Sequence, residues 1–140
     1  MSDVEPTQLQ LEAFTKGDVK QPLAMLNLLR FKEVATYEPG DKEPKRSGAE
    51  AYALYGAVAQ QKVREVGGDF IYVGPAQQTF VGPPDVKWDV VALVYYPSRE
   101  AFLRMVAMPD YQAATRHRRA GLAATRLIQC DGTHVNLPKK

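Results

Sequence analysis

A strongly apolar run extends from Leu23 to Phe31, directly after Pro22. It is short and nearly continuous, which is typical of a strand that is buried on both faces. Because side chains alternate along a strand, Asn27 lies on one face of this segment and Arg30 lies on the other. The pattern therefore predicts a strand in which one polar side chain interrupts each apolar face.

Three further runs predict the remaining strands. One covers Phe70–Val73 and continues, after a break at Gly74-Pro75, through Gln77–Val81. The next run, Trp88–Tyr96, is rich in β-branched and aromatic residues. The last predicted strand is Thr125–Cys130. The segments between these strands have helical spacing or turn residues.

Capping residues mark the starts of the helices. Thr7 begins a short helix that ends at residues 17–18. Ser47 and Glu50 have the spacing of a capping box and begin a longer helix, which ends at the glycine pair 67–68. Its predicted buried positions are Ala51, Tyr55, Val58, Ala59 and Val66, with Tyr52 at the edge.

A second helical region follows Pro97. Ser98 caps its first part, Pro109 interrupts it, and Asp110 is expected to cap a continuation that ends at Gly121. Since these helices alternate with the predicted strands, the element order is β-α-β-β-α-β behind a short helical extension.

This order is that of the ferredoxin-like α+β fold, in which a four-stranded antiparallel sheet carries both helices on one face. We expect an N-terminal helical extension over residues 1–22, the ferredoxin-like domain over 23–130 and a polar tail over 131–140. The first and third strands are apolar on both faces, so the uncovered face of the sheet would expose an apolar surface to water and tend to associate. We therefore expect a homodimer that packs sheet against sheet.

The composition narrows the classes of protein further. The chain has 140 residues, a formal net charge of +2 and one cysteine. One cysteine excludes an internal disulfide framework and a cysteine-based zinc cluster, and the small net charge gives no broad field for nucleic acid. Neither a secretory signal nor an apolar run of membrane-spanning length is recognised. We expect a cytoplasmic protein with no nucleic-acid or membrane partner.

Several short motifs occur in a consistent order between Pro22 and Cys130. They are Met25-Leu26-Asn27-Leu28-Leu29-Arg30-Phe31, Ala51-Tyr52-x-x-Tyr55, Gly67-Gly68, Trp88-Asp89, Tyr95-Tyr96-Pro97-Ser98, and Tyr111 followed by His117-Arg118. The ordered set resembles the family called domain of unknown function 1330, of the dimeric α/β-barrel superfamily. The resemblance implies a ferredoxin-like protomer and a homodimer with its sheets face to face. That superfamily includes haem-degrading and cofactor-independent monooxygenases, isomerases and haem proteins, so the resemblance selects no single reaction.

Three polar residues are candidates for catalysis. Arg118 shares a helical stripe with Tyr111 and Leu122, so its guanidinium is either paired or enters a polar pocket, where it could bind a substrate carboxylate or enolate. Asn27 needs hydrogen-bond partners in its apolar strand, either from the N-terminal segment or in a cleft between sheet and helices, where the resemblance to the monooxygenases places it. Asp89 could transfer a proton or pair with Arg118.

The candidate substrate-binding residues are aromatic. Trp88 could line the mouth of a pocket, and tyrosines could form a wall that offers hydroxyl donors. The alternative for each of them is packing in the core, or in a dimer contact for Trp88. The full set is Tyr52, Tyr55, Trp88, Tyr95 and Tyr111.

No metal or cofactor site is expected. His117 would be the ligand for haem, but it lies on a different helical face from Arg118 and within the basic run Arg116–Arg119, which disfavours a bound cation. The chain also contains no phosphate-binding glycine loop.

Three functions are compatible with these residues. The first is an enzyme without a tightly bound cofactor, whose pocket lies between sheet and helices under the polar loop Lys32–Arg46. It would isomerise an aromatic or polyketide-like compound or oxidise it with O₂. The second is a non-catalytic protein that binds a metabolite or is associated with stress. The third is a haem-binding protein that uses His117.

Overall fold

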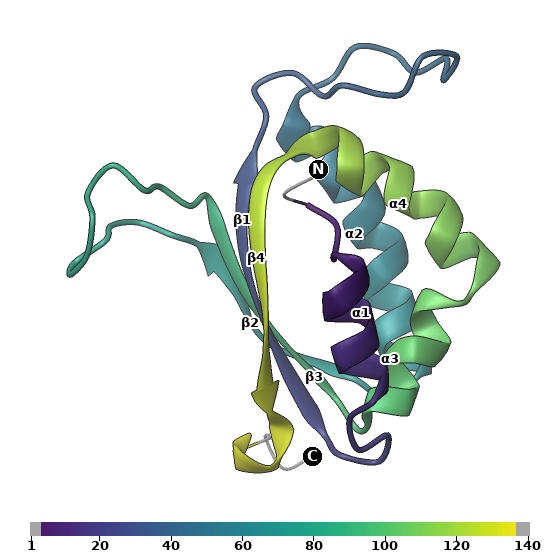
Figure 1. The fold of residues 1–140 in the computed structure, drawn as a ribbon. Coiled ribbons are helices and arrows are strands. Elements are labelled where there is room, and N and C mark those ends of the chain that lie inside the picture. The colour runs from purple at the N-terminus through teal and green to yellow at the C-terminus, as the bar shows by residue number, and fades with distance from the viewer. Residues whose placement is uncertain (1–3, 137–140) are drawn as a thin grey trace.

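A four-stranded antiparallel sheet has helices on one side and an uncovered face on the other (Figure 1). The structure is a computed structural model of the chain and describes residues 4–136. Its strands are β1 (Leu23–Phe31), β2 (Asp69–Pro75), β3 (Val90–Tyr96) and β4 (Leu122–Asp131), in the spatial order β2-β3-β1-β4. This order and the antiparallel pairing confirm the predicted ferredoxin-like fold.

The helices are α1 (Gln8–Thr15), α2 (Gly48–Glu65), α3 (Arg99–Val106) and α4 (Pro109–Gly121). The capping box predicted at Ser47 and the cap predicted at Thr7 are confirmed. Asp110 does not cap α4, because Pro109 already occupies the first helical position. The Asp110 carboxylate instead pairs with Lys62 of α2 at 2.6 Å.

The core lies between the helix-facing side of the sheet and the helices. β1 is central in the sheet, so its alternate side chains from Leu23 onward are enclosed by strands on both sides and by helices above. The described core residues with large side chains include Leu23, Met25, Tyr55, Val63, Val66, Val94, Tyr96, Met105 and Tyr111.

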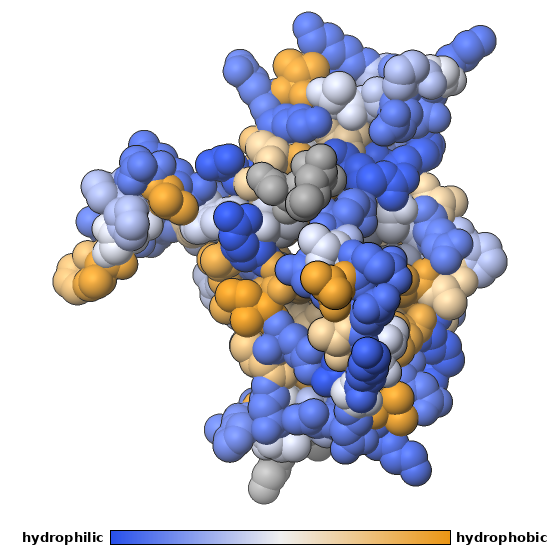
Figure 2. All heavy atoms as spheres, in the orientation of Figure 1, coloured by the Kyte–Doolittle hydropathy of each residue, from blue (hydrophilic) through white to orange (hydrophobic). Residues whose placement is uncertain are grey.

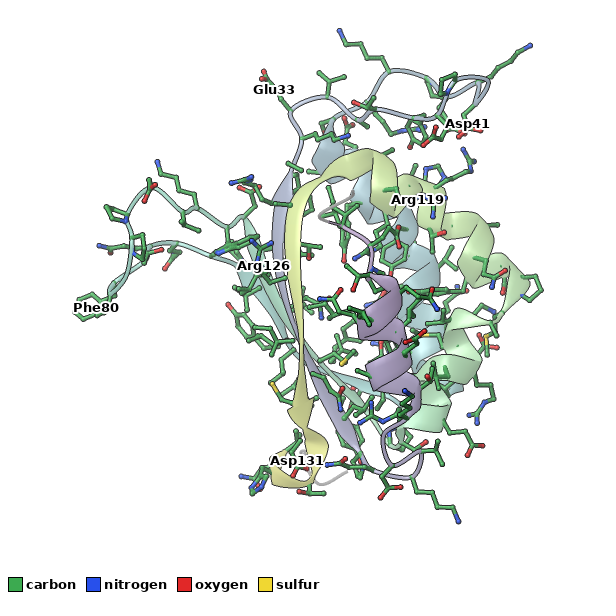
Figure 3. The ribbon with its side chains drawn as sticks, in the orientation of Figure 1. Glu33, Asp41, Phe80, Arg119, Arg126 and Asp131 are labelled. Atoms are coloured by element: carbon green, nitrogen blue, oxygen red, sulfur yellow. The ribbon has the colours of Figure 1, made fainter. Side chains whose placement is uncertain are left out.

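The predicted extension of the second strand over Gln77–Val81 is wrong. β2 ends at Pro75, and residues 76–89, the arm, project from the sheet on the side away from the helices (Figures 1 and 3). Gly82 has a φ of +131°, and the two prolines after it cannot donate to a ladder. Phe80 lies near the tip of the arm, where Figure 2 shows hydrophobic atoms, and it is 91% exposed.

Two other strand boundaries differ from the prediction. β3 begins at Val90 because its partner β2 ends opposite that residue, so Trp88 and Asp89 precede the strand. β4 begins at Leu122, immediately after α4, because Leu122 pairs with Phe31. The predicted polar tail begins as the end of β4 and a 3₁₀ turn, and residues 137–140 lie outside the described residues.

The sheet face opposite the helices carries apolar side chains that the described chain does not cover. These side chains are Leu26, Leu28, Val91, Leu93, Tyr95 and Ile128. The homodimer predicted to cover this face stays a prediction. No helix within residues 4–136 has the length and apolar content to cross a membrane.

Candidate functional site

An open cleft with a volume of about 1930 Å³ lies between part of the helix-facing side of the sheet and the helices, and core residues such as Met25 and Tyr55 line it. The sheet contributes Asn27, Leu29 and Ala92 to its lining, and α2 and α4 contribute Tyr55 and Arg118 among others. Most of the lining residues are apolar, and a few polar groups lie among them, which is the usual character of a small-molecule site.

Of the tyrosines that line this cleft, four lie in or against the core and come from three elements: Tyr52, Tyr55, Tyr96 and Tyr111. The rings of Tyr52 and Tyr55 lie 5.2 Å apart, and those of Tyr55 and Tyr111 lie 5.8 Å apart. The hydroxyl oxygens of Tyr55 and Tyr111 are 2.7 Å apart, so one hydroxyl donates to the other and the second proton is unused in this bond.

The hydroxyls of Tyr52 and Tyr96 make no hydrogen bond within residues 4–136. No fully buried polar side-chain atom in the same range lacks a partner, so these two hydroxyls are reached from the cleft. Burial raises the pKa of all four phenols, while the nearby Arg118 guanidinium acts in the opposite direction on the pKa of Tyr52, Tyr55 and Tyr111. The four phenols therefore remain neutral hydrogen-bond donors at physiological pH.

Arg118 is both paired and part of the lining. Its Nη1 donates to the carbonyl oxygen of Val4 at 2.7 Å and lies 3.8 Å from Oε1 of Glu5. The side chain is only 16% exposed. A guanidinium has five donors, and these contacts use few of them, so Arg118 keeps donors for a ligand in the cleft.

Asn27 lies on the sheet side of the cleft, as predicted. Its Nδ2 donates to the carbonyl of Met25 at 3.1 Å and, at a longer 3.4 Å, to that of Ala92. These bonds hold the amide against its own sheet and not against the N-terminal segment. Within the described residues Oδ1 accepts no hydrogen bond, which leaves it available to a donor on a ligand.

Three of the predicted site residues lie outside the cleft. Asp89 is structural, because its Oδ2 accepts from the backbone N–H of Phe31 at 2.8 Å and prolongs the pairing of β1 with β3. Trp88 packs beneath the guanidinium of Arg126, whose carbon lies 5.7 Å from the ring centroid. Tyr95 points to the uncovered face of the sheet, since its neighbour Tyr96 faces the helices.

The segment that covers the cleft is N-terminal, whereas the sequence predicted the loop Lys32–Arg46. Residues 4–7, here called the strap, line the cleft together with Gln10, Leu11 and Phe14 of α1. Sequence reasoning missed both Tyr96 and the strap. Alternation along β3 could have found Tyr96, but no local pattern marks the strap. Glu5 is the one carboxylate that lines the cleft in the described part of the chain.

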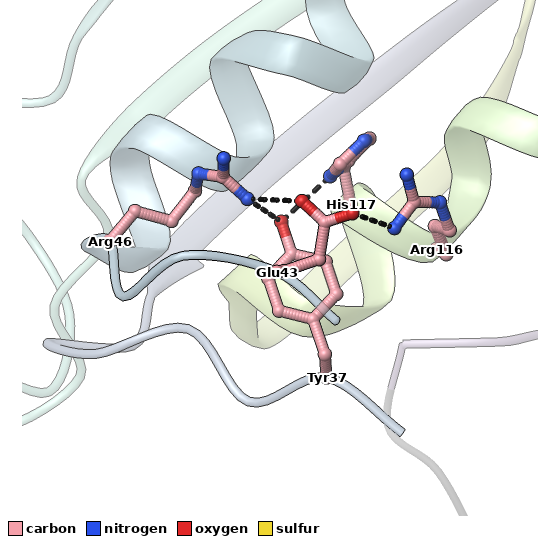
Figure 4. Close-up of polar contacts among 5 residues, drawn as sticks. All are labelled: Tyr37, Glu43, Arg46, Arg116 and His117. Carbon is pink, nitrogen blue, oxygen red and sulfur yellow. Dashed lines mark hydrogen bonds and ion pairs between the residues drawn. The ribbon is translucent and has the colours of Figure 1, made fainter. Parts of the chain in front are cut away.

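The loop Lys32–Arg46 is fixed to α4 by a polar cluster (Figure 4). Arg46 donates to the Tyr37 oxygen at 2.9 Å, so the Tyr37 hydroxyl can donate to Nδ1 of neutral His117 at 2.7 Å. Hydrogen bonds from Arg46 and Arg116 lower the pKa of the Glu43 carboxyl to about 2. Burial, with the charge of Arg116, lowers the pKa of His117.

His117 therefore has a structural partner and does not line the cleft. No group of three or more His, Cys, Asp or Glu side chains among residues 4–136 is arranged to hold a metal ion. The hypothesis that His117 binds haem stays a prediction, and its Nδ1 already bonds to Tyr37.

The comparisons with known proteins agree with the fold. The family model "Domain of unknown function (DUF1330)" matches residues 45–132. No curated protein matches the chain. The structure of the methylated RPA0582 protein is 34% identical, covers 98% of this chain and 97% of that one, and has a TM-score of 0.85.

Two other solved structures are also similar. The RPA0582 protein of unknown function from Rhodopseudomonas palustris is 34% identical over 94% of this chain and 97% of that one, with a TM-score of 0.83. SnoaB, a cofactor-independent oxygenase from Streptomyces nogalater, is 16% identical over 85% of this chain and 99% of that one. Its TM-score of 0.51 at this identity shows a likeness of fold alone.

Proposed function

The chain belongs to the DUF1330 family, and from this premise we propose that it binds a small, largely apolar anion in the cleft between the sheet and its helices. One observation carries the proposal: four neutral phenols and the guanidinium of Arg118 line a single cleft with apolar walls. Hydrogen-bond donors fixed around a site of low polarity stabilise a carboxylate, a phenolate or an enolate.

The same groups are suited to catalysis on such a ligand. A ligand that binds as an enolate would accept hydrogen bonds from Tyr52 and Arg118, while the free Oδ1 of Asn27 would accept one from a hydroxyl of the ligand. We propose the activity of an enzyme without a tightly bound cofactor, which isomerises an aromatic or polyketide-like compound or oxidises it with O₂. A binding protein without turnover would use the same contacts, and consumption of the ligand separates the two.

Titration with 1-hydroxy-2-naphthoate tests the proposal, because this probe combines an apolar ring system with a carboxylate. We expect Arg118→Met to weaken binding about tenfold or more, since a charge-assisted hydrogen bond is worth roughly 1.5–3 kcal/mol. Tyr96→Phe should weaken binding several-fold, and Tyr95→Phe is the matched control on the opposite face of the sheet. The proposal is wrong if the probe does not bind the wild type, or if it binds Arg118→Met and Tyr96→Phe as tightly as the wild type.

We also propose that two copies pack through the uncovered sheet face. Its apolar side chains, among them Leu26 and Leu93, support this, because a contiguous apolar patch of this kind marks an interaction surface. Light scattering after size-exclusion chromatography should give a dimer for the wild type and a monomer for Leu26→Asp. Leu54→Asp, on a 42% exposed position of α2, is the control that should remain dimeric. A monomeric wild type would contradict the proposal.

A further inference from the structure

The structure points to a competitor built into the chain: Glu5 of the strap occupies the place that a ligand carboxylate takes against Arg118 and Arg119. The inference rests on the proposed function, because it concerns the anion-binding end of the same cleft. It adds a ligand class, an apolar carboxylate, and a requirement that the strap move when this ligand binds.

The contacts of Glu5 are long enough for a ligand carboxylate to replace its side chain. Oε1 of Glu5 lies 3.8 Å from Nη1 of Arg118 and 3.8 Å from Nη1 of Arg119. Both distances exceed that of a direct hydrogen bond, and the Glu5 side chain is 41% exposed. A ligand carboxylate could approach the same two guanidinium groups more closely and accept paired hydrogen bonds. Glu5 therefore marks the position of an anion without filling it tightly.

The strap and α1 are held by a buried side chain at one end and by partly exposed side chains at the other. Arg99, which is 5% exposed, holds the C-terminal end of α1: its Nη1 donates to the carbonyl of Phe14 at 2.7 Å and its guanidinium lies 4.5 Å from the Phe14 ring centroid. No residue of α1 is fully buried, and Leu9 is 77% exposed. At the opposite end, Val4 and Glu5 contact Arg118, and Glu5 also approaches Arg119.

This asymmetry gives the strap a hinge, the contact of Arg99 with Phe14, and a latch, the contact of Glu5 with Arg118 and Arg119. In Figure 1, α1 lies between β4 and the helix layer with its strap end toward α4, and Figure 3 shows Arg119 on α4 at that end. Release of the latch would free the strap while Arg99 keeps the base of α1 in place. A ligand carboxylate that binds Arg118 and Arg119 replaces the carboxylate of Glu5 on the two guanidinium groups. The ligand contact therefore compensates for the loss of the Glu5 contact.

The ligand class follows from the charges and walls of the cleft. The displaced group is a carboxylate, and the adjoining lining is aromatic and aliphatic, so the fitting ligand is an acid on an apolar ring system. A neutral amide of the same shape brings no charge to compete with Glu5. The charge of the ligand, and not its shape, should therefore determine whether the strap is released.

Full-length Glu5→Gln tests the inference, with Glu12→Gln as the matched control, because Glu12 lies on α1 outside the cleft lining. The probes are 2-naphthoate and 2-naphthamide. We expect Glu5→Gln to bind 2-naphthoate about 2- to 5-fold more tightly than the wild type, the range of an exposed ion pair, and to bind 2-naphthamide unchanged. Glu12→Gln should match the wild type with both probes. Equal 2-naphthoate affinities of wild type and Glu5→Gln would overturn the inference and leave the proposed function standing.

Amide hydrogen exchange in α1 provides a readout that needs no ligand. Without any probe, the α1 amides of Glu5→Gln should exchange a few-fold faster than those of the wild type or Glu12→Gln. Saturating 2-naphthoate should speed exchange in the wild type in the same way. Unchanged exchange in Glu5→Gln, or slower exchange with 2-naphthoate, would overturn the inference. If neither probe binds while exchange in Glu5→Gln rises, the latch is upheld and the proposed ligand-binding function fails.

Discussion

The buried hydroxyl pair of Tyr55 and Tyr111 allows a quantitative test of the polar groups in the cleft. The two oxygens lie 2.7 Å apart on side chains of residues that are 9% and 8% exposed. Tyr111→Phe removes a hydrogen bond worth about 1 kcal/mol and leaves the Tyr55 hydroxyl without its partner, so we expect a loss of about 1–2 kcal/mol in the free energy of unfolding. Tyr55→Phe should cost the same for the same reason.

The double variant distinguishes a hydrogen bond from two separate packing effects. Once both hydroxyls are removed no unpaired group remains, so Tyr55→Phe/Tyr111→Phe should cost no more than either single variant. The coupling energy is then about 1 kcal/mol or more. Urea unfolding followed by circular dichroism measures all four proteins, with Tyr72→Phe, at a position 53% exposed, as the control. If the two single losses add in the double variant to within about 0.3 kcal/mol, the two hydroxyls are not coupled and the reasoning is refuted.

Three further outcomes are expected. Asp89→Ala should lower the free energy of unfolding by about 1 kcal/mol in urea denaturation, because the N–H of Phe31 loses its acceptor, while 1-hydroxy-2-naphthoate binding stays unchanged. Because the folded pKa of His117 is lowered, stability should fall as the pH drops from about 6.5 toward that lowered pKa, and His117→Phe should remove this part of the pH dependence in urea unfolding curves. Arg99→Met should cost roughly 2–3 kcal/mol by thermal denaturation, since a nearly buried guanidinium loses its charge-assisted bonds; a loss below about 0.5 kcal/mol would contradict its anchoring role.

Local chemistry made much of the fold predictable from the sequence. β1 was placed to the residue, because Pro22 ends the preceding segment and the nine residues after it are almost all apolar. The start of α2 was equally clear, since the capping box of Ser47 and Glu50 satisfies backbone groups within one turn. The segment 77–81 misled because its β-branched and aromatic content suits a strand, although no opposing strand extends far enough to pair with it.

The candidate site was predictable only where a helix periodicity or a strand alternation reports directly on it. Arg118 and Asn27 were found in this way. The sequence does not separate Tyr95 from Tyr96, because both faces of β3 are apolar and the pattern does not reveal which face meets the helices. Glu5 could not be found, because its position depends on contacts with Arg118, more than a hundred residues later in the chain.

The central place of β1 has a consequence for how the chain is made. Leu23 pairs with Asp131, about a hundred residues later, and with Tyr96 on the other side. During synthesis β1 emerges before β3 and β4, and its edges stay unpaired until both have followed. Contacts of such long sequence separation slow folding, and an unpaired apolar strand is prone to aggregate. We expect nascent chains truncated before Leu122 to need protection by chaperones, and refolding of the released chain to be limited by the docking of β4.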